Sequence, residues 1–399
     1  MSASRPLAGV TVVDLSRHLP GPLAAKLLAD LGARVVKVEE PRAGDPVRLA
    51  PPLVRGRSAL AAALLSGVES VALDLKNERA REVLAALLEC ADALLETFRP
   101  GTLARLGFPP AELAERFPRL VVCSLSGYGE DGPEADRAGH DLTYQALAGA
   151  LAPTARMPAL PLADLAGAWS AALAVVAALR RRDATGRGTR IDASLYDAGL
   201  HANLVDWAEE AGGERGVGQP LPLSGALACY NLYLTADRGY VAVACLERHF
   251  WERFCAAVGR NDLARRHLDT RPEAKRAVQA VVGARTRDEW AALAHEHDLP
   301  IEPVLSASEA RAHPQARRRA VVGAGNDGLA RVAFPALFEG ERPAASDRVP
   351  GLGEDTDAVL AELGVPMTGR EKRAAGVGRR RDVRRVVAGW VSKRRTPKV

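Results

Sequence analysis

The sequence predicts an α/β protein in which a largely parallel sheet is covered by helices and followed by a second, smaller domain. Strand-like apolar runs alternate with helical patterns over the first 126 residues, and a Gly/Pro-rich stretch begins near Gly212. The chain has 399 residues, of which 47% are hydrophobic and 26% charged. This length and composition suit a soluble globular protein with a sizeable core.

The first elements read as strand, helix and strand. The run "GVTVVDL" (9–15) is apolar and β-branched. Residues 20–32 have helical spacing, with Pro22 where a first-turn proline is tolerated, and residues 33–39 return to a strand pattern. These three segments predict a βαβ unit.

The alternation then continues along the chain. Strands are expected at 70–75, 92–98 and 119–126, and Asn77 is placed to cap the helix after the first of them. Strands connected by helices pair in parallel, so we expect one parallel sheet.

The second half contains fewer strand signals. The apolar stretch 165–179 predicts a buried helix, and residues 186–212 predict a strand and a helix. Beyond the Gly/Pro-rich connection, two strands are expected around a turn at 236–239, followed by helical patterns to about residue 318. We therefore divide the chain into a large domain (1–212), a small domain (213–320), a segment 321–368 and a tail 369–399.

Several classes of protein are disfavoured. No apolar run reaches the roughly 20 residues that a membrane span needs, and the N-terminus runs directly into a strand pattern, which leaves no room for a signal peptide. The five cysteines form no CxxC pair and most lie in apolar runs, which indicates structural thiols and a cytoplasmic protein.

The net charge of +5 comes from the tail. Residues 370–399 carry twelve Lys or Arg against Glu371 and Asp382, a charge of +10 that leaves −5 for the rest. The tail is interpreted as a solvated extension, although "DVRRVVAGWV" also suits a short amphipathic helix. A rival hypothesis is a catalytically inactive protein that binds nucleic acid through this tail. The negative net charge of the rest of the chain argues against a polyanionic partner.

Common nucleotide and metal motifs are absent from the sequence. Glu39 matches the acid of a dinucleotide-binding fold, but the GxGxxG glycines are missing, which argues against an NAD-dependent dehydrogenase. The sequence "HEHD" (295–298) resembles metal ligands but has no matching cluster, so we interpret it as the end of a surface helix and expect no metal site.

Three side chains at predicted helix starts are suited to acid/base chemistry. Asp141 is expected to cap the helix that follows it. The adjacent His140 has no evident structural duty, and the positive end of the helix favours a neutral imidazole that accepts a proton. Asp164 begins the longest apolar helix, where helix amides would hold its carboxylate ionised as a nucleophile or base.

From Pro6 to about Val365 the chain resembles the class III CoA-transferase (CaiB/BaiF) family, which includes the α-methylacyl-CoA racemases. The order and number of matching motifs carry this resemblance. They include "PLAGVTVVDLSRHLPGPLAAKLLADLGARVVKVEEP", "SVALDLKNERAREVL", "FRPGTLARLGF", "LVVCSLSGYGEDGP", "GHDLTYQALAGAL", "GRGTRIDASLYDAGL", "YNLYLTADRGYVAVACLERHFWERFCAAVGR" and "LGEDTDAVLAELG".

The resemblance implies an acyl-CoA substrate, no further cofactor, and an interlocked, ring-like homodimer. Each subunit would combine a Rossmann-like large domain with a small domain, and the chain would return to the large domain from about residue 321. The matching motifs place CoA against Leu19, Pro20, Leu73, Asp74, Leu75, Lys76, Thr97, Phe98, Arg99 and Arg105, with Arg137 as a phosphate contact. Glu40 departs from the family, which often has arginine there, and Arg42 or Arg48 could compensate.

Two chemistries occur on this scaffold. In the transferases, the aspartate matching Asp164 attacks the acyl-CoA carbonyl and forms a mixed anhydride. In the racemases, that aspartate and the histidine matching His140 exchange the α-proton from opposite faces. Glu247 matches a glutamate that supports the histidine, and Asp141 is a second candidate for orienting it.

The retained residues favour proton transfer over CoA transfer. Besides His140 and Glu247, Tyr144 matches the tyrosine of the racemase motif. Three departures indicate an altered substrate pocket: a shortened segment between His140 and Asp164, "LSGALAC" in place of the usual proline motif, and "ADRG" in place of "ADG". We therefore keep CoA transfer as the alternative.

Overall fold

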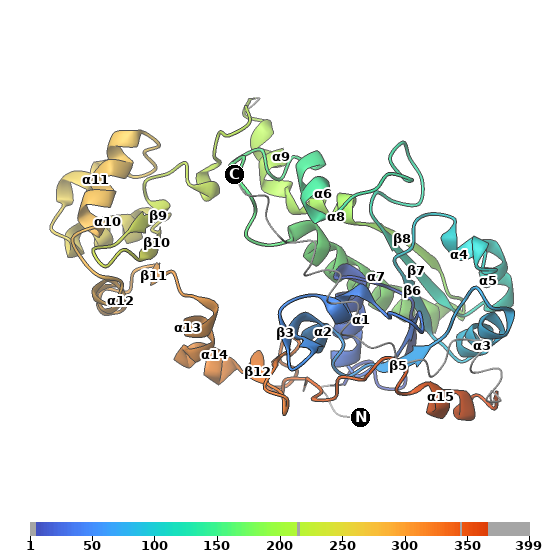
Figure 1. Cartoon of the computed structure of the whole chain (residues 1–399). Coiled ribbons are helices and arrows are strands. Elements are labelled where there is room, and N and C mark those ends of the chain that lie inside the picture. Colours follow the sequence, from blue (N-terminus) through green and yellow to red (C-terminus); the bar gives the residue numbers. More distant parts are fainter. Residues whose placement is uncertain (1–4, 214–215, 344, 366–399) are drawn as a thin grey trace, which may run out of the picture. The chain divides into compact units, whose positions relative to one another are not determined.

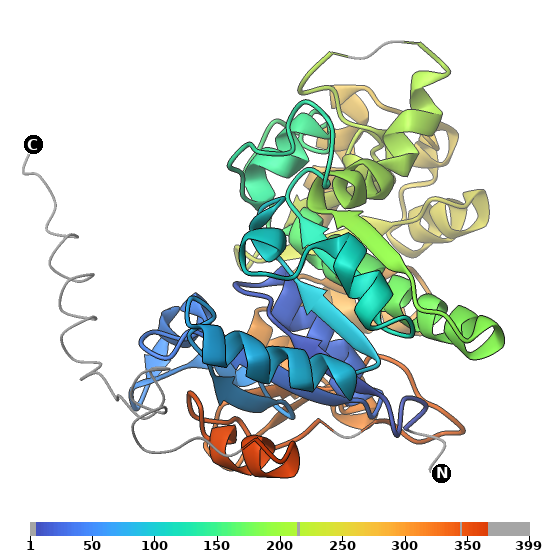
Figure 2. The same ribbon diagram turned by 90° about the vertical axis from the view of Figure 1, so that its right-hand side faces the viewer.

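A computed structural model describes residues 5–213, 216–343 and 345–365 of the chain. The basic tail, with its expected amphipathic helix, lies outside the described residues. The described chain divides into two compact units, shown in Figures 1 and 2. The first unit comprises described residues of 1–148, 160–202 and 317–365; the second comprises 149–159 and those of 203–316.

The first unit is built on a six-stranded sheet in which every neighbouring pair is parallel. In spatial order the strands are β5 (Glu69–Ala72), β2 (Arg34–Glu39), β1 (Thr11–Asp14), β6 (Ala93–Glu96), β7 (Val121–Ser126) and β8 (Arg190–Ser194). Numbered within this sheet, the order is 3-2-1-4-5-6, the order of Rossmann-type folds. The predicted parallel sheet is confirmed.

Helices cover both faces of this sheet. Because side chains alternate along a strand, Val12 packs into the core on one face and its neighbour Val13 into the core on the other. The first core contains α1 (Pro20–Asp30) and α7 (Leu162–Thr185), and the second contains α3 (Glu78–Glu89).

The remaining elements of the first unit are shorter. They are η1 (Pro46–Leu49), β3 (Leu53–Val54), β4 (Arg57–Ser58), α2 (Ala59–Leu64), α4 (Thr102–Arg105), α5 (Pro110–Arg116), α6 (Asp141–Leu147), α8 (Leu195–Ala202), β12 (Val322–Ala324), β13 (Ala330–Val332) and α15 (Thr356–Glu362). The helix α14 (Pro314–Arg319) spans the boundary between the units. As predicted, Asn77 caps α3: its side chain accepts from the Arg79 amide at 2.9 Å.

The outer edge of β5 is covered by the C-terminal part of the first unit, and Figure 2 shows this part, in orange-red, beside the blue N-terminal segments. The Ser70 amide donates to the Asp355 carboxylate at 2.8 Å, and the Ala72 amide donates to the Thr356 hydroxyl at 3.0 Å. These two side chains take the hydrogen bonds that a seventh strand would otherwise make.

The second unit contains the expected pair of strands. β9 (Tyr230–Leu234) and β10 (Tyr240–Ala244) pair antiparallel around the turn, and β11 (Ile301–Pro303) adds a third strand. Helices surround a core that includes buried Trp251 and Trp290. The helices that contribute buried residues to this core are α10 (Arg248–Ala257), η3 (Asn261–Arg266), α11 (Pro272–Val282) and α12 (Arg287–Glu296). The unit also contains α9 (Leu204–Glu210), η2 (Pro222–Ser224) and α13 (Ala307–Ala312).

Helix α7 is longer than the sequence suggested, with 24 residues that begin at Leu162. Within the described residues it alone is long and apolar enough to cross a membrane by length and composition, which corrects the expectation that no segment reaches that length. One face carries buried Ala168, Ala171 and Val175 in the core of the first unit. A core helix that packs on a sheet in this way meets the same criteria of length and composition without entering a membrane.

A buried lysine connects the ends of the central strands. Lys37 on β2 is fully buried and lies 3.1 Å from both the Asp14 and the Asp45 carboxylates. Its ammonium also donates to the Ser16 carbonyl at 2.7 Å. Burial alone would lower the pKa of Lys37, but the carboxylates of Asp14, Asp45 and Glu39 outweigh burial and raise it, so Lys37 stays charged.

We predict that Lys37→Met destabilises the protein strongly, because two buried carboxylates lose their counter-charge. The expected loss is about 3–5 kcal/mol in the free energy of unfolding, measured by urea unfolding followed by circular dichroism. Lys76→Met removes an exposed lysine and should change stability by less than about 0.5 kcal/mol. Equal stability of the two variants would contradict this assignment.

Candidate active site

A cavity of about 150 Å³ lies at the carboxyl ends of β1, β2, β5 and β6. This is the edge of a doubly wound sheet at which ligands bind. The lining residues are Leu15, Ser16, Arg17, Val38, Glu39, Glu40, Gly44, Asp45, Leu73, Asp74, Leu75, Lys76, Phe98 and Leu106. The structure therefore brings together the predicted CoA contacts Leu73, Asp74, Leu75, Lys76 and Phe98.

The predicted contacts Leu19, Pro20 and Thr97 lie beside this cavity in the chain but do not line it. Leu19 is the N-cap residue of α1, and Pro20 is buried in its first turn. The Thr97 hydroxyl accepts from the Arg17 amide at 2.9 Å, which ties the loop after β6 to the loop after β1.

The three predicted arginine contacts also lie outside the lining. Arg105 donates to the Thr102 hydroxyl at 2.7 Å, and Arg137 is exposed and pairs with Glu134 at 2.7 Å. Arg99 interacts electrostatically with Tyr144.

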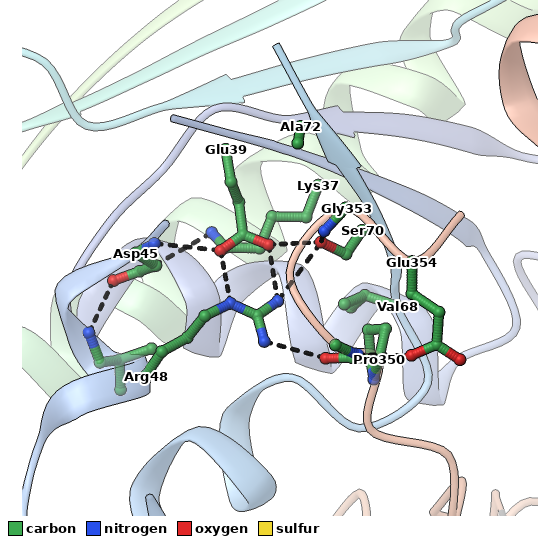
Figure 3. Close-up of polar contacts among 12 residues, drawn as sticks. Lys37, Glu39, Asp45, Arg48, Val68, Ser70, Ala72, Pro350, Gly353 and Glu354 are labelled. Carbon is green, nitrogen blue, oxygen red and sulfur yellow. Dashed lines mark hydrogen bonds and ion pairs between the residues drawn. The ribbon is translucent and has the colours of Figure 1, made fainter. Parts of the chain in front are cut away.

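Glu39 and Arg48 form a salt bridge, shown in Figure 3. The buried Glu39 carboxylate accepts from Arg48 Nε at 2.7 Å and Nη2 at 2.6 Å, and from the Ser70 hydroxyl at 2.7 Å. Arg48 also donates to the Pro350 carbonyl at 2.9 Å. Burial alone would raise the pKa of Glu39, but Arg48 outweighs it and lowers this pKa. Arg48 is therefore not available to compensate for Glu40, which corrects that expectation.

The start of helix α6 differs from the prediction that Asp141 caps it. His140 is the N-cap residue, with extended backbone (φ −141°, ψ 168°), and Asp141 is already helical. The Thr143 hydroxyl accepts from the His140 amide at 3.0 Å and donates to the His140 carbonyl at 2.8 Å. Because Thr143 supports the turn, the exposed His140 imidazole is not needed as a cap.

The Asp141 carboxylate holds the start of α7 instead. One oxygen accepts from the Asp164 amide at 3.1 Å, and the other accepts from Gln145 Nε2 at 2.7 Å. Gln145 also donates to the Leu160 carbonyl at 3.3 Å. The expectation that Asp141 orients the imidazole is thus corrected, since its carboxylate fixes the backbone of Asp164.

The Asp164 carboxyl lies in the first turn of α7 and is half-buried. Burial, reinforced by the negative charge of Asp141, raises the pKa of Asp164 to about 7. The expectation that helix amides hold this carboxylate ionised is therefore wrong, because desolvation and the neighbouring carboxylate oppose the helix dipole. Near neutral pH, Asp164 is able both to give and to accept a proton.

Tyr144 packs close to these groups. Glycine at 127 and 139 makes room for its ring, since a Cβ at Gly139 would meet the ring at 2.5 Å. Tyr128 contacts Tyr144 edge-on at 5.0 Å between ring centres. Burial, with smaller contributions from Tyr128 and Asp164, raises the pKa of Tyr144 to about 12, so its hydroxyl keeps its proton at neutral pH.

Glu247 belongs to the second unit, where it is the exposed N-cap residue of α10. The segment 295–298 lies at the end of α12, as expected. Across residues 5–213, 216–343 and 345–365, no group of three or more His, Cys, Asp or Glu side chains is placed to hold a metal ion.

The comparisons with known proteins agree with this fold. The model of CoA-transferase family III matches residues 7–356. The chain therefore belongs to this family of acyl-CoA enzymes, which contains both CoA-transferases and α-methylacyl-CoA racemases.

Relatives of both kinds are similar to the chain. An acetyl-CoA:oxalate CoA-transferase of Acetobacter aceti is 31% identical over 90% of this chain and 96% of its own length. The α-methylacyl-CoA racemase of Homo sapiens is 34% identical over 90% of this chain and 93% of its own length. A CaiB/BaiF family protein from Brucella suis matches with a TM-score of 0.80 and 28% identity, covering 90% of this chain and all of that one.

Several residues that shape the site were missed by sequence analysis. Ser16 and Asp45 line the cavity, and Gln145 anchors Asp141. Gln145 could have been found, because it stands four residues after Asp141 on one helix face. Nothing in the sequence marks Asp45, whose role depends on the buried Lys37.

We predict that Asp164→Asn becomes more stable relative to the natural chain as pH rises. The pKa of Asp164 is near 3.8 when unfolded and about 7 when folded, so ionisation increasingly destabilises the natural fold between these values. The stability difference should grow from pH 4 to pH 7 and then level off, as measured by thermal unfolding at each pH. A difference that is constant with pH would contradict the raised pKa.

Proposed function

We propose that the protein exchanges the α-proton of a 2-methyl-branched acyl-CoA and so racemises or epimerises that carbon. The raised pKa of Asp164 carries this proposal, because a carboxyl near 7 serves as acid or base with similar ease. His140 supplies a second proton carrier at the start of the adjacent helix. The hydrogen bond from the Asp164 amide to Asp141 joins these two helix starts.

In the proposed reaction, neutral His140 takes the α-proton from one face of the substrate. The electron pair of the broken C–H bond moves into the thioester, whose oxygen becomes an enolate stabilised by amides at a helix start. Protonated Asp164 then gives a proton to the opposite face. His140 is then protonated and Asp164 ionised, which is the state that converts the other enantiomer, and proton exchange with solvent water restores the starting state.

The cavity supports the CoA part of this proposal. Lys76 contributes a positive charge, and Phe98 and Leu73 contribute apolar surface. The reaction uses only side chains, backbone amides and the substrate thioester, so we propose no further cofactor. We also retain cytoplasmic localisation as a proposal, in keeping with five cysteines that are all free thiols.

CoA transfer between two carboxylic acids is the second candidate. It is supported by the 31% identity to an oxalate CoA-transferase and by the position of Asp164 in a matching motif. In that reaction the Asp164 carboxylate attacks the thioester carbonyl, the thiolate of CoA leaves, and a mixed anhydride forms. The nucleophile must be ionised, which a pKa of about 7 disfavours below neutral pH.

We predict that the protein incorporates deuterium at the α-carbon of a 2-methylacyl-CoA in heavy water without an acceptor acid. His140→Ala removes one proton carrier and should slow exchange by about 10²-fold or more, as followed by mass spectrometry. Asp164→Asn should have a comparable effect.

The alternative makes a different prediction in the same samples. If no exchange occurs with any branched acyl-CoA while acceptor acids receive CoA in an Asp164-dependent way, the racemase proposal is wrong. His295→Ala, on the exposed end of α12, is the matched control and should leave exchange unchanged.

We further propose that the protein forms the interlocked homodimer of its family. Apolar side chains remain exposed on two helices of the first unit: Leu142 and Leu147 on α6, and Trp169 and Leu173 on α7. Trp169 and Leu173 are four residues apart and share one helix face. Exposed apolar residues gathered on neighbouring helices suit a subunit interface.

We predict a dimer for the natural chain in sedimentation velocity at micromolar concentration. Leu173→Asp places a charge on the proposed interface and should shift the protein to a monomer, whereas Arg180→Asp near the other end of α7 should not. A monomeric natural chain would refute the dimer without affecting the assignment of His140 and Asp164.

A further inference from the structure

We propose that the cavity of the first unit recognises the ribose of CoA through its free 2′-hydroxyl and gains little from the 3′-phosphate, with Glu40 setting this preference. The inference rests on the proposed function, namely that this cavity holds the adenosine end of a CoA thioester. It adds a specificity residue that the reaction chemistry does not require.

The position of Glu40 is the first argument. In a sheet with this strand order, an acidic residue at the end of the second strand accepts hydrogen bonds from the ribose hydroxyls, whereas a ribose phosphate needs an arginine. Glu39 ends β2 but is closed off by Arg48 and Ser70, as Figure 3 shows. The next residue, Glu40, is exposed and lines the cavity, so it is the acid that a ligand meets.

The Glu40 carboxylate is also held in place. One of its oxygens accepts from the Ala43 amide at 2.9 Å, which closes the turn after β2. A carboxylate fixed in this way keeps further lone pairs free for a ribose hydroxyl.

The charges of the cavity are the second argument. Its ionisable lining residues are Arg17, Glu39, Glu40, Asp45, Asp74 and Lys76. Two of these acids already have cations, Glu39 with Arg48 and Asp45 with Lys37. The cations left for a ligand are Arg17 and Lys76, and Glu40 and Asp74 remain as carboxylates.

Two cations are enough for the diphosphate of CoA but not for the diphosphate and the 3′-phosphate together. The diphosphate carries two negative charges, which Arg17 and Lys76 are able to balance. The 3′-phosphate adds nearly two more negative charges, and at the end of β2 these would meet the Glu40 carboxylate. Repulsion between exposed groups of this kind weakens binding by about fivefold to tenfold, which offsets what the phosphate gains elsewhere.

The test compares the binding of CoA and 3′-dephospho-CoA by isothermal titration calorimetry at fixed ionic strength. We expect the natural chain to bind both with dissociation constants within about threefold of each other. Glu40→Gln removes the charge while its amide oxygen still accepts from Ala43, and should tighten CoA about fivefold with little change for 3′-dephospho-CoA. Glu40→Arg should favour CoA by more than tenfold.

Glu296→Arg is the matched control for Glu40→Arg. It makes the same change of charge on an exposed residue that does not line the cavity. It should leave the ratio of the two dissociation constants unchanged. The inference is overturned if the natural chain binds CoA tenfold more tightly than 3′-dephospho-CoA and neither variant of Glu40 alters that ratio. If neither compound binds to the natural chain, the proposed function fails and the inference fails with it.

Discussion

The buried ammonium of Lys37 is the interaction on which the site depends. It connects two strands and the loops that follow them, since Lys37 on β2 pairs with Asp14 at the end of β1, with Asp45 after β2 and with the Ser16 carbonyl after β1. Asp45 in turn accepts from the His18 amide at 3.0 Å, and His18 has the left-handed φ of 72° that non-glycine residues rarely adopt. A strained backbone of this kind persists where its surroundings hold it, so a buried charge pair fixes the rim of the cavity.

Few contacts connect the cavity with the two helix starts that carry His140 and Asp164. The Arg17 amide ties the loop after β1 to Thr97, and Arg99 in that second loop interacts with Tyr144. Tyr144 lies on α6, whose first residue, Asp141, anchors the start of α7. The rigid edge of the parallel sheet thus supports both the loop that would hold CoA and the two helices that carry the proposed proton-transfer groups.

The fold was largely predictable, whereas the electrostatics of the site were not. Strand and helix patterns record burial residue by residue, so the parallel sheet and the Asn77 cap follow from local sequence. The roles of Asp141 and Asp164 depend on a contact between residues 23 positions apart, which no local pattern records. For the same reason Arg48 looked free in the sequence, although Glu39 and the Pro350 carbonyl occupy it in the fold.

The outer edge of β5 is covered by residues near the end of the chain, which affects how the protein folds during its synthesis. The amides of Ser70 and Ala72 are capped by Asp355 and Thr356, nearly 300 residues later in the chain. Until that segment has been synthesised, the nascent sheet presents an open edge able to pair with strands of other molecules. A chain that ends before residue 355 is therefore exposed to aggregation through β5 even if its cavity and helices are formed.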